Sequence, residues 1–548
     1  MQSFGRFSDA PAFRDNPFRF ASEDSILGEK DLGIAGDRVT VLTPECAAAR
    51  VEGLQNCPFT ASGFSLEVRV DGERIPGRKW TWLPNVIRRS GTRGAFAAET
   101  VTLIPPGGDG VVMFVSFRNR TETTVAAPIQ LIHGGSSRKE AIWNFSVPRA
   151  GEAHFASASF CPDGQGTALL LTGEAPDVAG DAARAGSAEA SVTVTASLAG
   201  LRYFANAEMA ETEWIAAPGE ILQFAVFVHL GAASDTKHYA SFRAYENAAE
   251  KAFRWLEEET ERIFSRLPRF SSDAPALDRL FVRSLVTYSL NRFENPYYAV
   301  SPFYATGSVT GGCMCSYLWD YSGGMMLHPL VDAETNRKMI LAYLRADLCT
   351  SYAILPLDGS PTGPWYHINQ EKIIGMIYYH VLQTGDLSFL SETVGGKTVL
   401  DWAVFHALVL DDPEKPVALA DYGEAAKSHL ELRRHYVYQG IVPDLNARRY
   451  MNYYRAYRLT CMAGKPDERL LTRAQGLRPL LETLWDDEAG WYDYVWEGKR
   501  AKRYTVQMFK FFDSPVIDDG RRRRLAEHLN EKEYDSDALN KIFNDKEK

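Results

Sequence analysis

Three segments in the second half of the chain combine aromatic rings with carboxylate or amide side chains. The first runs from Tyr317 to Gly324 and places Trp319 directly before Asp320. An indole face stacks on the C–H face of a sugar ring, and a neighbouring carboxylate accepts hydrogen bonds from sugar hydroxyls. The pair therefore predicts a sugar-binding site. The same residues are also typical of a helix start, with Asp320 in the first turn and Trp319 in the core.

The second segment, from Gly363 to Gln370, mixes aromatic rings with amides immediately before a predicted helix. Its candidate substrate-binding residues are Trp365, Tyr366, Asn369 and Gln370. The alternative interpretation is a capped helix start with a buried tryptophan.

The third segment supplies carboxylates on a glycine-containing loop, Ala420–Glu424, which is followed by a tight turn that opens a helix. Asp421 and Glu424 are the candidate catalytic residues, and Asn446 is a candidate for substrate binding. Cleavage of a glycosidic bond needs a general acid, because an alkoxide is a poor leaving group, and a nearby carboxylate helps to keep an acid protonated near neutral pH. For Asp444 the pattern favours the N-cap of a helix.

Other sequence patterns that mark catalytic, phosphate or metal sites are incomplete or absent. Residues 395–398 read Gly-Gly-Lys-Thr, like the end of a phosphate-binding loop, but Ser391 stands where the leading glycine is required. Cys313 and Cys315 form a lone Cys-x-Cys, which we interpret as packing or loop thiols. The sequence contains no His-Glu-x-x-His, no paired Cys-x-x-Cys and no Gly-x-Ser-x-Gly. We therefore predict neither a metal nor a cofactor.

Short strands precede these segments, up to about residue 233. From residue 64 to residue 70 apolar and polar residues alternate (Phe-Ser-Leu-Glu-Val-Arg-Val), and the following Asp71-Gly72 indicates a tight turn. Similar runs occur at residues 111–117, 168–172, 191–197 and 221–230. Many short strands separated by turn signals predict an antiparallel β-sandwich over residues 1–235, with a loop at 173–190.

Helical spacing of apolar residues begins at residue 242 and predicts a linking helix within residues 236–270, which Pro268 ends. Further helices are expected at 275–291 (capped by Ser271–Asp273), 320–330, 334–347, 370–382, 389–410, 445–462, 467–485 and 518–530, with an extended piece at 490–496. Successive helices with short connections pack as antiparallel hairpins, so residues 271–548 are predicted to form an (α/α)6-type toroid whose loops line a central cup. A closed ring of six hairpins needs about twelve helices and about nine are predicted, so we expect the last hairpins to be missing.

Composition limits the class of protein. The chain has 548 residues, 45% hydrophobic and 24% charged, which is enough for two or three domains. Its net charge of −10 disfavours a general nucleic-acid binder. Seven thinly spread cysteines do not make a disulfide framework, and neither a signal peptide nor a run of ~20 apolar residues is found. We expect a cytoplasmic protein whose partner is a carbohydrate, with no nucleic-acid or membrane partner.

Taken together, the three segments resemble the trehalase group of inverting glycosidases and the related processing α-glucosidases, within the six-hairpin glycosidase superfamily. In that group a Trp-Asp motif binds the sugar, and a second loop precedes a helix that ends in a Thr-Gly-Asp-like turn, here Thr384–Asp386. A third loop holds the general acid and is followed by Val-Asp-Leu-Asn, here Pro-Asp-Leu-Asn at 443–446. Asp444 follows Asp421 by 23 residues, a similar interval. The resemblance covers roughly residues 275–490.

The resemblance implies that Asp421 is the general acid and that Trp319 and Asp320 bind the sugar. The third loop departs from the family, because Ala-Asp-Tyr-Gly-Glu replaces Gly-Trp-Asp and the Ser-Ser-Arg that follows it. This departure leaves Glu424 and Glu431 as rival acids and argues against trehalose as the substrate. A β-sandwich in front of the helices matches the processing glucosidases better than the trehalases.

The family's catalytic base is a glutamate in the last hairpins, well over a hundred residues after the acid. Only 127 residues follow Asp421, and their last stretch lacks apolar periodicity. We therefore expect the base to be missing, as in a truncated reading frame or an inactivated relative. The favoured function is an inverting glycoside hydrolase for α-linked glycosides or oligosaccharides. A glycoside phosphorylase of similar architecture and a non-catalytic glycan-binding relative are the open alternatives, as is a polysaccharide lyase, although lyases usually place the toroid before the sheets.

Overall fold

The computed structural model describes residues 14–22, 31–139, 155, 157–163, 166–172, 190–232, 242–306, 314–415, 417–424 and 439–529. Residues 173–189 of the predicted loop, the rival acid Glu431 and the tail from residue 530 lie outside these ranges. The chain divides into two compact units, one of residues 1–316 and 355–360 and one of residues 317–354 and 361–548. The predicted boundaries at residues 235 and 270 mark the change from strands to helices. By their contacts, however, the linking helix and residues 271–316 belong to the first unit.

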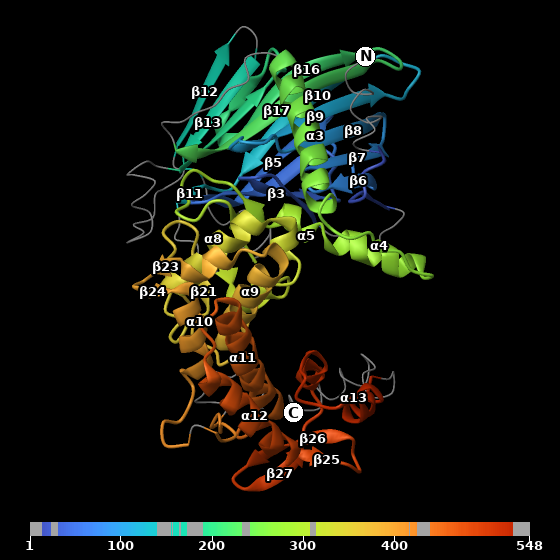
Figure 1. Cartoon of the computed structure of the whole chain (residues 1–548). Helices are drawn as coiled ribbons and strands as arrows, with labels where there is room; N and C mark the ends of the chain where they lie inside the picture. Colours follow the sequence, from blue (N-terminus) through green and yellow to red (C-terminus); the bar gives the residue numbers. More distant parts are fainter. Residues whose placement is uncertain are drawn as a thin grey trace. The chain divides into compact units, whose positions relative to one another are not determined.

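Two antiparallel sheets make up most of the first unit (Figure 1). Within the described ranges, a nine-stranded sheet has the order β1 (Phe20–Ala21), β6 (Lys79–Leu83), β7 (Val86–Arg93), β8 (Phe96–Leu103), β9 (Gly110–Asn119), β17 (Ile221–Ala232), β14 (Ala190–Ala196), β13 (Gly166–Thr172), β12 (Ser157–Asp163). The second sheet has the order β15 (Arg202–Phe204), β16 (Met209–Ala216), β10 (Val125–Gly134), β5 (Phe59–Val70), β4 (Arg50–Asn56), β3 (Thr40–Pro44), β2 (Asp31–Ala35), with β11 (Arg138–Lys139) beside β5. The predicted strands are found as β5, β9, β13, β14 and β17, which confirms the antiparallel sandwich.

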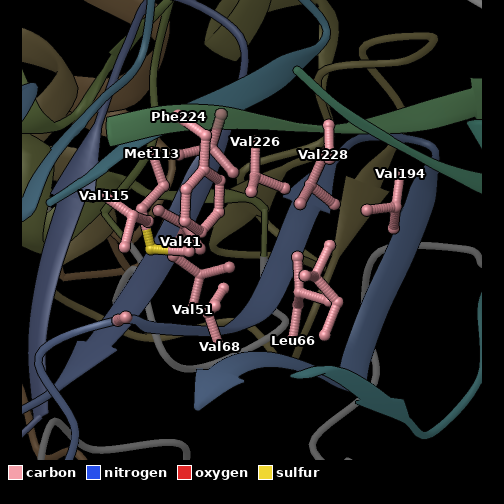
Figure 2. Close-up of a cluster of buried hydrophobic side chains, with 14 of the residues drawn as sticks. Val41, Val51, Leu66, Val68, Met113, Val115, Val194, Phe224, Val226 and Val228 are labelled. Carbon is pink, nitrogen blue, oxygen red and sulfur yellow. The ribbon is translucent and has the colours of Figure 1, made fainter. Parts of the chain in front are cut away.

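The core of this unit lies between the two sheets, where alternate residues of each strand face inward. Figure 2 shows apolar side chains from the two sheets pointing toward one another. The second sheet contributes Val41, Val51, Leu66 and Val68, and the nine-stranded sheet contributes Met113, Val115, Val194, Phe224, Val226 and Val228. Removal of this apolar surface from water is the main favourable term for the fold of the unit.

A long helix, α3 (Phe242–Phe264), packs along the nine-stranded sheet (Figure 1). Its buried face repeats every three or four residues and includes Tyr245, Ala249, Ala252, Leu256 and Ile263. The hydroxyls of Thr195 and Tyr245 lie 3.1 Å apart, and Asn85 Nδ2 donates to the Ala252 carbonyl at 3.1 Å. The helix is therefore fixed to the sandwich by polar contacts as well as by apolar packing.

Helices dominate the second unit. In order they are α6 (Leu318–Ser322), α7 (His328–Val331), α8 (Ala333–Arg345), α9 (Asn369–Thr384), α10 (Val399–Leu408), α11 (Pro443–Met462), α12 (Glu468–Glu482) and α13 (Asp519–Ala526). Between them lie β21 (Ala353–Ile354), β22 (Pro361–Thr362), β25 (Trp485–Asp486), β26 (Trp491–Trp496), β27 (Lys499–Lys502) and the 3-10 helix η5 (Val506–Asp513). The helix α9 is buried on most sides because it packs against α6, α7, α8, α10 and α11.

Three predicted helices are interrupted. The expected helix at 389–410 is instead η4 (Leu387–Ser391), a hairpin of β23 (Thr393–Val394) and β24 (Lys397–Thr398), and then α10. Gly395 and Gly396 turn the hairpin with φ of +57° and +81°, and Thr398 starts α10 through a capping box with Asp401.

The expected helix at 320–330 is split into α6 and α7, and that at 275–291 into α4 (Pro275–Ser284) and α5 (Thr287–Leu290). The predicted cap at Ser271–Asp273 is wrong, because Ala274 precedes α4 and makes no side-chain cap. The Ser272 hydroxyl bonds instead to the side chain of Asp278.

Candidate functional site

Trp319 and Asp320 lie on α6, a short helix near the start of the second unit. Asp320 is in its first turn, as the helix-start interpretation expected, but the core positions are Leu318 and Tyr321. Trp319 is half-buried and Asp320 is exposed. Partial loss of water around its carboxyl group raises the pKa of Asp320.

Tyr321, the residue after Asp320, is held at three points. Its ring stacks on that of His328 with centroids 4.1 Å apart, and His328 Nε2 donates to the Tyr321 carbonyl at 2.6 Å. Its hydroxyl donates to Asn336 Oδ1 at 3.1 Å, and Asn336 Nδ2 donates to His380 Nδ1 at 3.2 Å. Burial lowers the pKa of His380 to about 4, so its ring is neutral near pH 7 and can accept this bond. The short helix that carries Asp320 is thereby tied to α8 and α9.

Tyr352 connects the first segment to the second. Its ring stacks on Tyr317 with centroids 5.2 Å apart and meets the ring of Tyr366 edge-on at 4.9 Å. Gly363 lies against the same ring with φ of +74°, and a Cβ at this position would overlap the Tyr352 side chain. Glycine is therefore required for the loop to approach Tyr352 this closely.

His367 connects the second segment to the third. Its ring centroid lies 4.2 Å from that of Trp365 and 4.9 Å from that of Tyr422, the residue that follows Asp421. Trp365 is half-buried, and its Nε1 makes no hydrogen bond within the described part of the chain. The three segments predicted from the sequence are thus joined through ring contacts in one unit.

Asn369 and Gln370 are fully buried at the start of α9. The Asn369 amide donates to the carbonyls of Leu348 and Ser351 at 3.0 and 2.7 Å, so it holds the turn that precedes Tyr352. Gln370 Nε2 approaches Cys349 Sγ at 3.8 Å, and burial raises the pKa of that thiol. Both predicted sugar ligands therefore support the loop from inside.

A buried ion cluster follows in the same turn, and sequence reasoning missed it. Glu371 pairs with Lys372 and with Arg455, each at 2.9 Å, and all three side chains are buried. Burial opposes ionisation, but the charges of Lys372, Arg455 and Arg448 hold the pKa of Glu371 well below its usual range. Its oxygens are already matched by cations, which makes Glu371 a structural ion rather than a group free to activate water.

Asp421 begins a small three-stranded pairing in which it bridges to Ile441, and Ile441 bridges to Val495 on β26. Because successive residues of an extended chain face opposite sides, the Tyr422 side chain is buried while that of Asp421 is exposed. The Asp421 carboxylate accepts a hydrogen bond from the Gly423 backbone N–H at 2.8 Å. The loop therefore presents the predicted acid to solvent in a fixed local turn.

Asn446 fixes this loop from below. It is fully buried on α11, its Oδ1 accepts from the Ala420 N–H at 2.8 Å, and its Nδ2 donates to the Ala420 and Val442 carbonyls at 3.1 and 3.0 Å. Arg449 donates to the same Oδ1 at 3.3 Å. The amide has no capacity left for a sugar, and its role is to hold the residue next to Asp421.

The N-cap interpretation of Asp444 is wrong. Val442 is the N-cap of α11, and Pro443 occupies the first turn ahead of Asp444. Asp444 is fully buried, accepts from Tyr494 Oη at 3.1 Å and lies 4.0 Å from Arg448 Nη2. It ties α11 to the strand that supports the Asp421 loop.

The predicted site residues thus fall into two groups. Those wholly or partly exposed are Trp319, Asp320, Trp365, Asp421 and Glu424. Those buried are Tyr366, Asn369, Gln370 and Asn446. Sequence reasoning missed the connecting role of Tyr352, which lies outside all three segments, directly before β21, and which no sequence pattern singled out. Within the described ranges no three His, Cys, Asp or Glu side chains gather as a metal site, and no described helix is long and apolar enough to span a membrane.

No family model matches the chain, and no curated protein matches it in sequence. Solved structures do match in fold. A protein assigned as a kojibiose phosphorylase from the human microbiome aligns with a TM-score of 0.52 at 9% identity, over 95% of this chain and 76% of its own. A bacterial glucoamylase complexed with acarbose aligns with a TM-score of 0.54 at 11% identity, over 91% of this chain and 79% of its own. A family GH92 α-mannosidase from Bacteroides thetaiotaomicron aligns with a TM-score of 0.43 at 12% identity, over 92% and 72% of the two chains.

At these identities the first two alignments show the fold. The chain shares the architecture of these two structures, in which an N-terminal antiparallel sandwich is followed by a helical domain, which is partial in this chain.

Proposed function

We propose that the protein is a glycoside hydrolase that acts on α-linked glycosides or oligosaccharides with inversion at the anomeric centre. The observation that carries the proposal is the set of ring contacts through Tyr352 and His367, which join the three segments that bear tryptophans and carboxylates. Its support from outside the chain is the shared fold with a glucoamylase that binds acarbose.

In the proposed site Trp319 and Trp365 offer indole faces to the sugar, and Asp320 accepts hydrogen bonds from its hydroxyls. Asp421 donates a proton to the leaving glycosidic oxygen. Inversion also requires a second carboxylate that removes a proton from the water attacking the opposite face of the ring, and this is the base that the family resemblance does not locate in the sequence. Such a pair stands about 6.5–9.5 Å apart. Glu424, which is also exposed, is the rival for the acid role.

The acid assignment is tested with Asp421→Asn, and with Glu424→Gln as the matched control on the same loop. We expect Asp421→Asn to lose turnover of unactivated α-glycosides by about 10²-fold or more. It should keep much of its turnover of 2,4-dinitrophenyl glycosides, whose leaving group needs no proton, and it should still bind the glycoside. Near-normal turnover of unactivated glycosides by Asp421→Asn, with loss in Glu424→Gln, would transfer the acid role to Glu424.

A glycoside phosphorylase is the second candidate, and it is supported by the fold shared with the protein assigned as a kojibiose phosphorylase. The two reactions differ in the nucleophile, so the products decide between them. Release of a sugar phosphate that depends on added inorganic phosphate indicates the phosphorylase, whereas release of free sugar in its absence indicates the hydrolase. Glycan binding without cleavage of activated aryl glycosides indicates a non-catalytic relative. The cytoplasmic location also remains a proposal, and cell fractionation tests it.

A further inference from the structure

The hydrogen bonds that connect Tyr321, Asn336 and His380 have no part in the proposed chemistry, yet Tyr321 is the residue directly after Asp320. The helix α6 has five residues, and the side chain of its N-cap makes no capping hydrogen bond. A helix this short does not hold its own geometry in water. Its position must come from what it contacts.

Tyr321 supplies those contacts. Its backbone carbonyl and ring are both engaged by His328, and its hydroxyl begins the chain through Asn336 to His380. Asn336 and His380 are 1% and 2% exposed, so these two side chains lie inside the unit. Neither residue touches the proposed sugar site.

We propose that Tyr321, Asn336 and His380 form a positioning relay that fixes the carboxylate of Asp320 for sugar binding. The inference rests on the proposed function, because it needs Asp320 to be a sugar ligand. It gives a role to three residues that lie outside the predicted site or were not singled out in it. His380 acts over 60 positions of sequence because α9, which carries it, packs against both α6 and α8.

Tyr321→Phe is the sharpest perturbation, because it keeps the ring on His328 and removes only the hydroxyl. The probe is acarbose, with affinity measured by calorimetry. We expect binding to weaken by about 3- to 10-fold, the usual range for loss of one neutral hydrogen bond. Tyr492→Phe is the matched control: Tyr492 is 1% exposed in the same unit and stacks on Phe511 at 4.3 Å, and its hydroxyl makes no hydrogen bond within the described ranges. Its affinity for acarbose should stay within about twofold of the wild type.

A double-mutant cycle separates positioning from general loosening of the unit. If the relay acts through Asp320, Tyr321→Phe should cost less than about twofold in an Asp320→Asn background. His380→Leu should give the same loss as Tyr321→Phe, and the two together should cost no more than either alone. An equal cost of Tyr321→Phe with and without the Asp320 carboxylate overturns the relay.

A second readout needs no ligand. With 5-fluorotryptophan incorporated, the ¹⁹F resonance of Trp319 should move in Tyr321→Phe and His380→Leu and stay in place in Tyr492→Phe. An unmoved resonance overturns the relay even if sugars bind. A moved resonance in a protein that binds no glycan supports the relay as a determinant of α6 geometry and counts against the proposed function alone.

Discussion

One side chain, Asn446, bonds both backbone groups of Ala420, the residue before Asp421, and its removal has a calculable cost. In Asn446→Ala the Ala420 N–H and C=O each lose their partner. A net intramolecular hydrogen bond is worth about 0.5–1.5 kcal/mol, and leaving half-buried backbone groups unpaired adds to this loss. We expect about 2–3 kcal/mol for these two contacts, which corresponds to roughly a 30- to 150-fold rise in local opening.

Hydrogen exchange read by mass spectrometry reports this opening directly. A peptide that covers residues 417–424 should exchange faster in Asn446→Ala by about that factor. Asn452→Ala is the matched control, because Asn452 lies on the same helix, is 4% exposed and makes no side-chain hydrogen bond within the described ranges. It loses a similar amount of packing and should leave the peptide unchanged.

Turnover should distinguish the two variants in the same way as hydrogen exchange does. Asn446→Ala should lower the turnover of unactivated glycosides, because the loop spends more time away from its bound geometry, and Asn452→Ala should not. Equal exchange rates at residues 417–424 in the two variants would refute the reasoning, since packing alone would then account for the loop's order.

Two further predictions concern the sandwich. Glu67 is 4% exposed; burial raises its pKa, but hydrogen bonds from Arg74 and Arg69 outweigh burial and lower the pKa from 4.5 to about 2. Because the pKa of Glu67 is lower in the folded than in the unfolded chain, its ionisation adds about 3 kcal/mol to the free energy of unfolding above pH 4.5. This contribution is lost as the pH falls toward 2. The free energy of unfolding of Glu67→Gln should therefore depend less steeply on pH in acid. Arg89 is fully buried and donates to the carbonyls of Pro44, Ala47 and Arg50 and to Thr102 Oγ1. In urea unfolding Arg89→Met should cost about 3–5 kcal/mol, against less than about 1 kcal/mol for Arg88→Met, because Arg88 and its partner Glu99 are only half-buried. Similar costs for the two variants would contradict this account.

Element type was predictable wherever one face of an element is buried, because burial imposes a period on the sequence. The alternation at residues 64–70 predicts β5, and the helical spacing after residue 242 predicts α3. The errors fall where local turn chemistry outweighs that period. Gly395-Gly396 and the Thr398–Asp401 capping box both mark a break inside the expected helix at 389–410, and apolar residues on either side hid it.

The burial of the predicted site residues could not be predicted from the sequence. Asn446 and Asn369 look like sugar ligands in sequence, yet both amides are spent on backbone groups of loops that lie far away along the chain. Whether a polar side chain is buried depends on tertiary packing, which no short sequence pattern reveals. The same holds for Glu371, whose place in a first helical turn is visible in the sequence, whereas its pairing with Arg455, 84 positions later, is not.

The aromatic residues of the three segments divide their work in a way that bears on ligand binding. Tyr366 and Tyr422 are buried in ring contacts between loops, and Tyr352, from outside the segments, contacts both Tyr317 and Tyr366. Trp319 and Trp365 are half-buried and keep part of their surface exposed. Each ring pair is worth about 0.5–1.5 kcal/mol beyond the area it buries, so the contacts order the loops before any ligand arrives. Loops that are already ordered lose less conformational entropy when a ligand binds. The ring contacts between the segments therefore preform the loop geometry, and in the proposed site Trp319, Trp365 and the exposed carboxylates are the groups expected to contact the sugar.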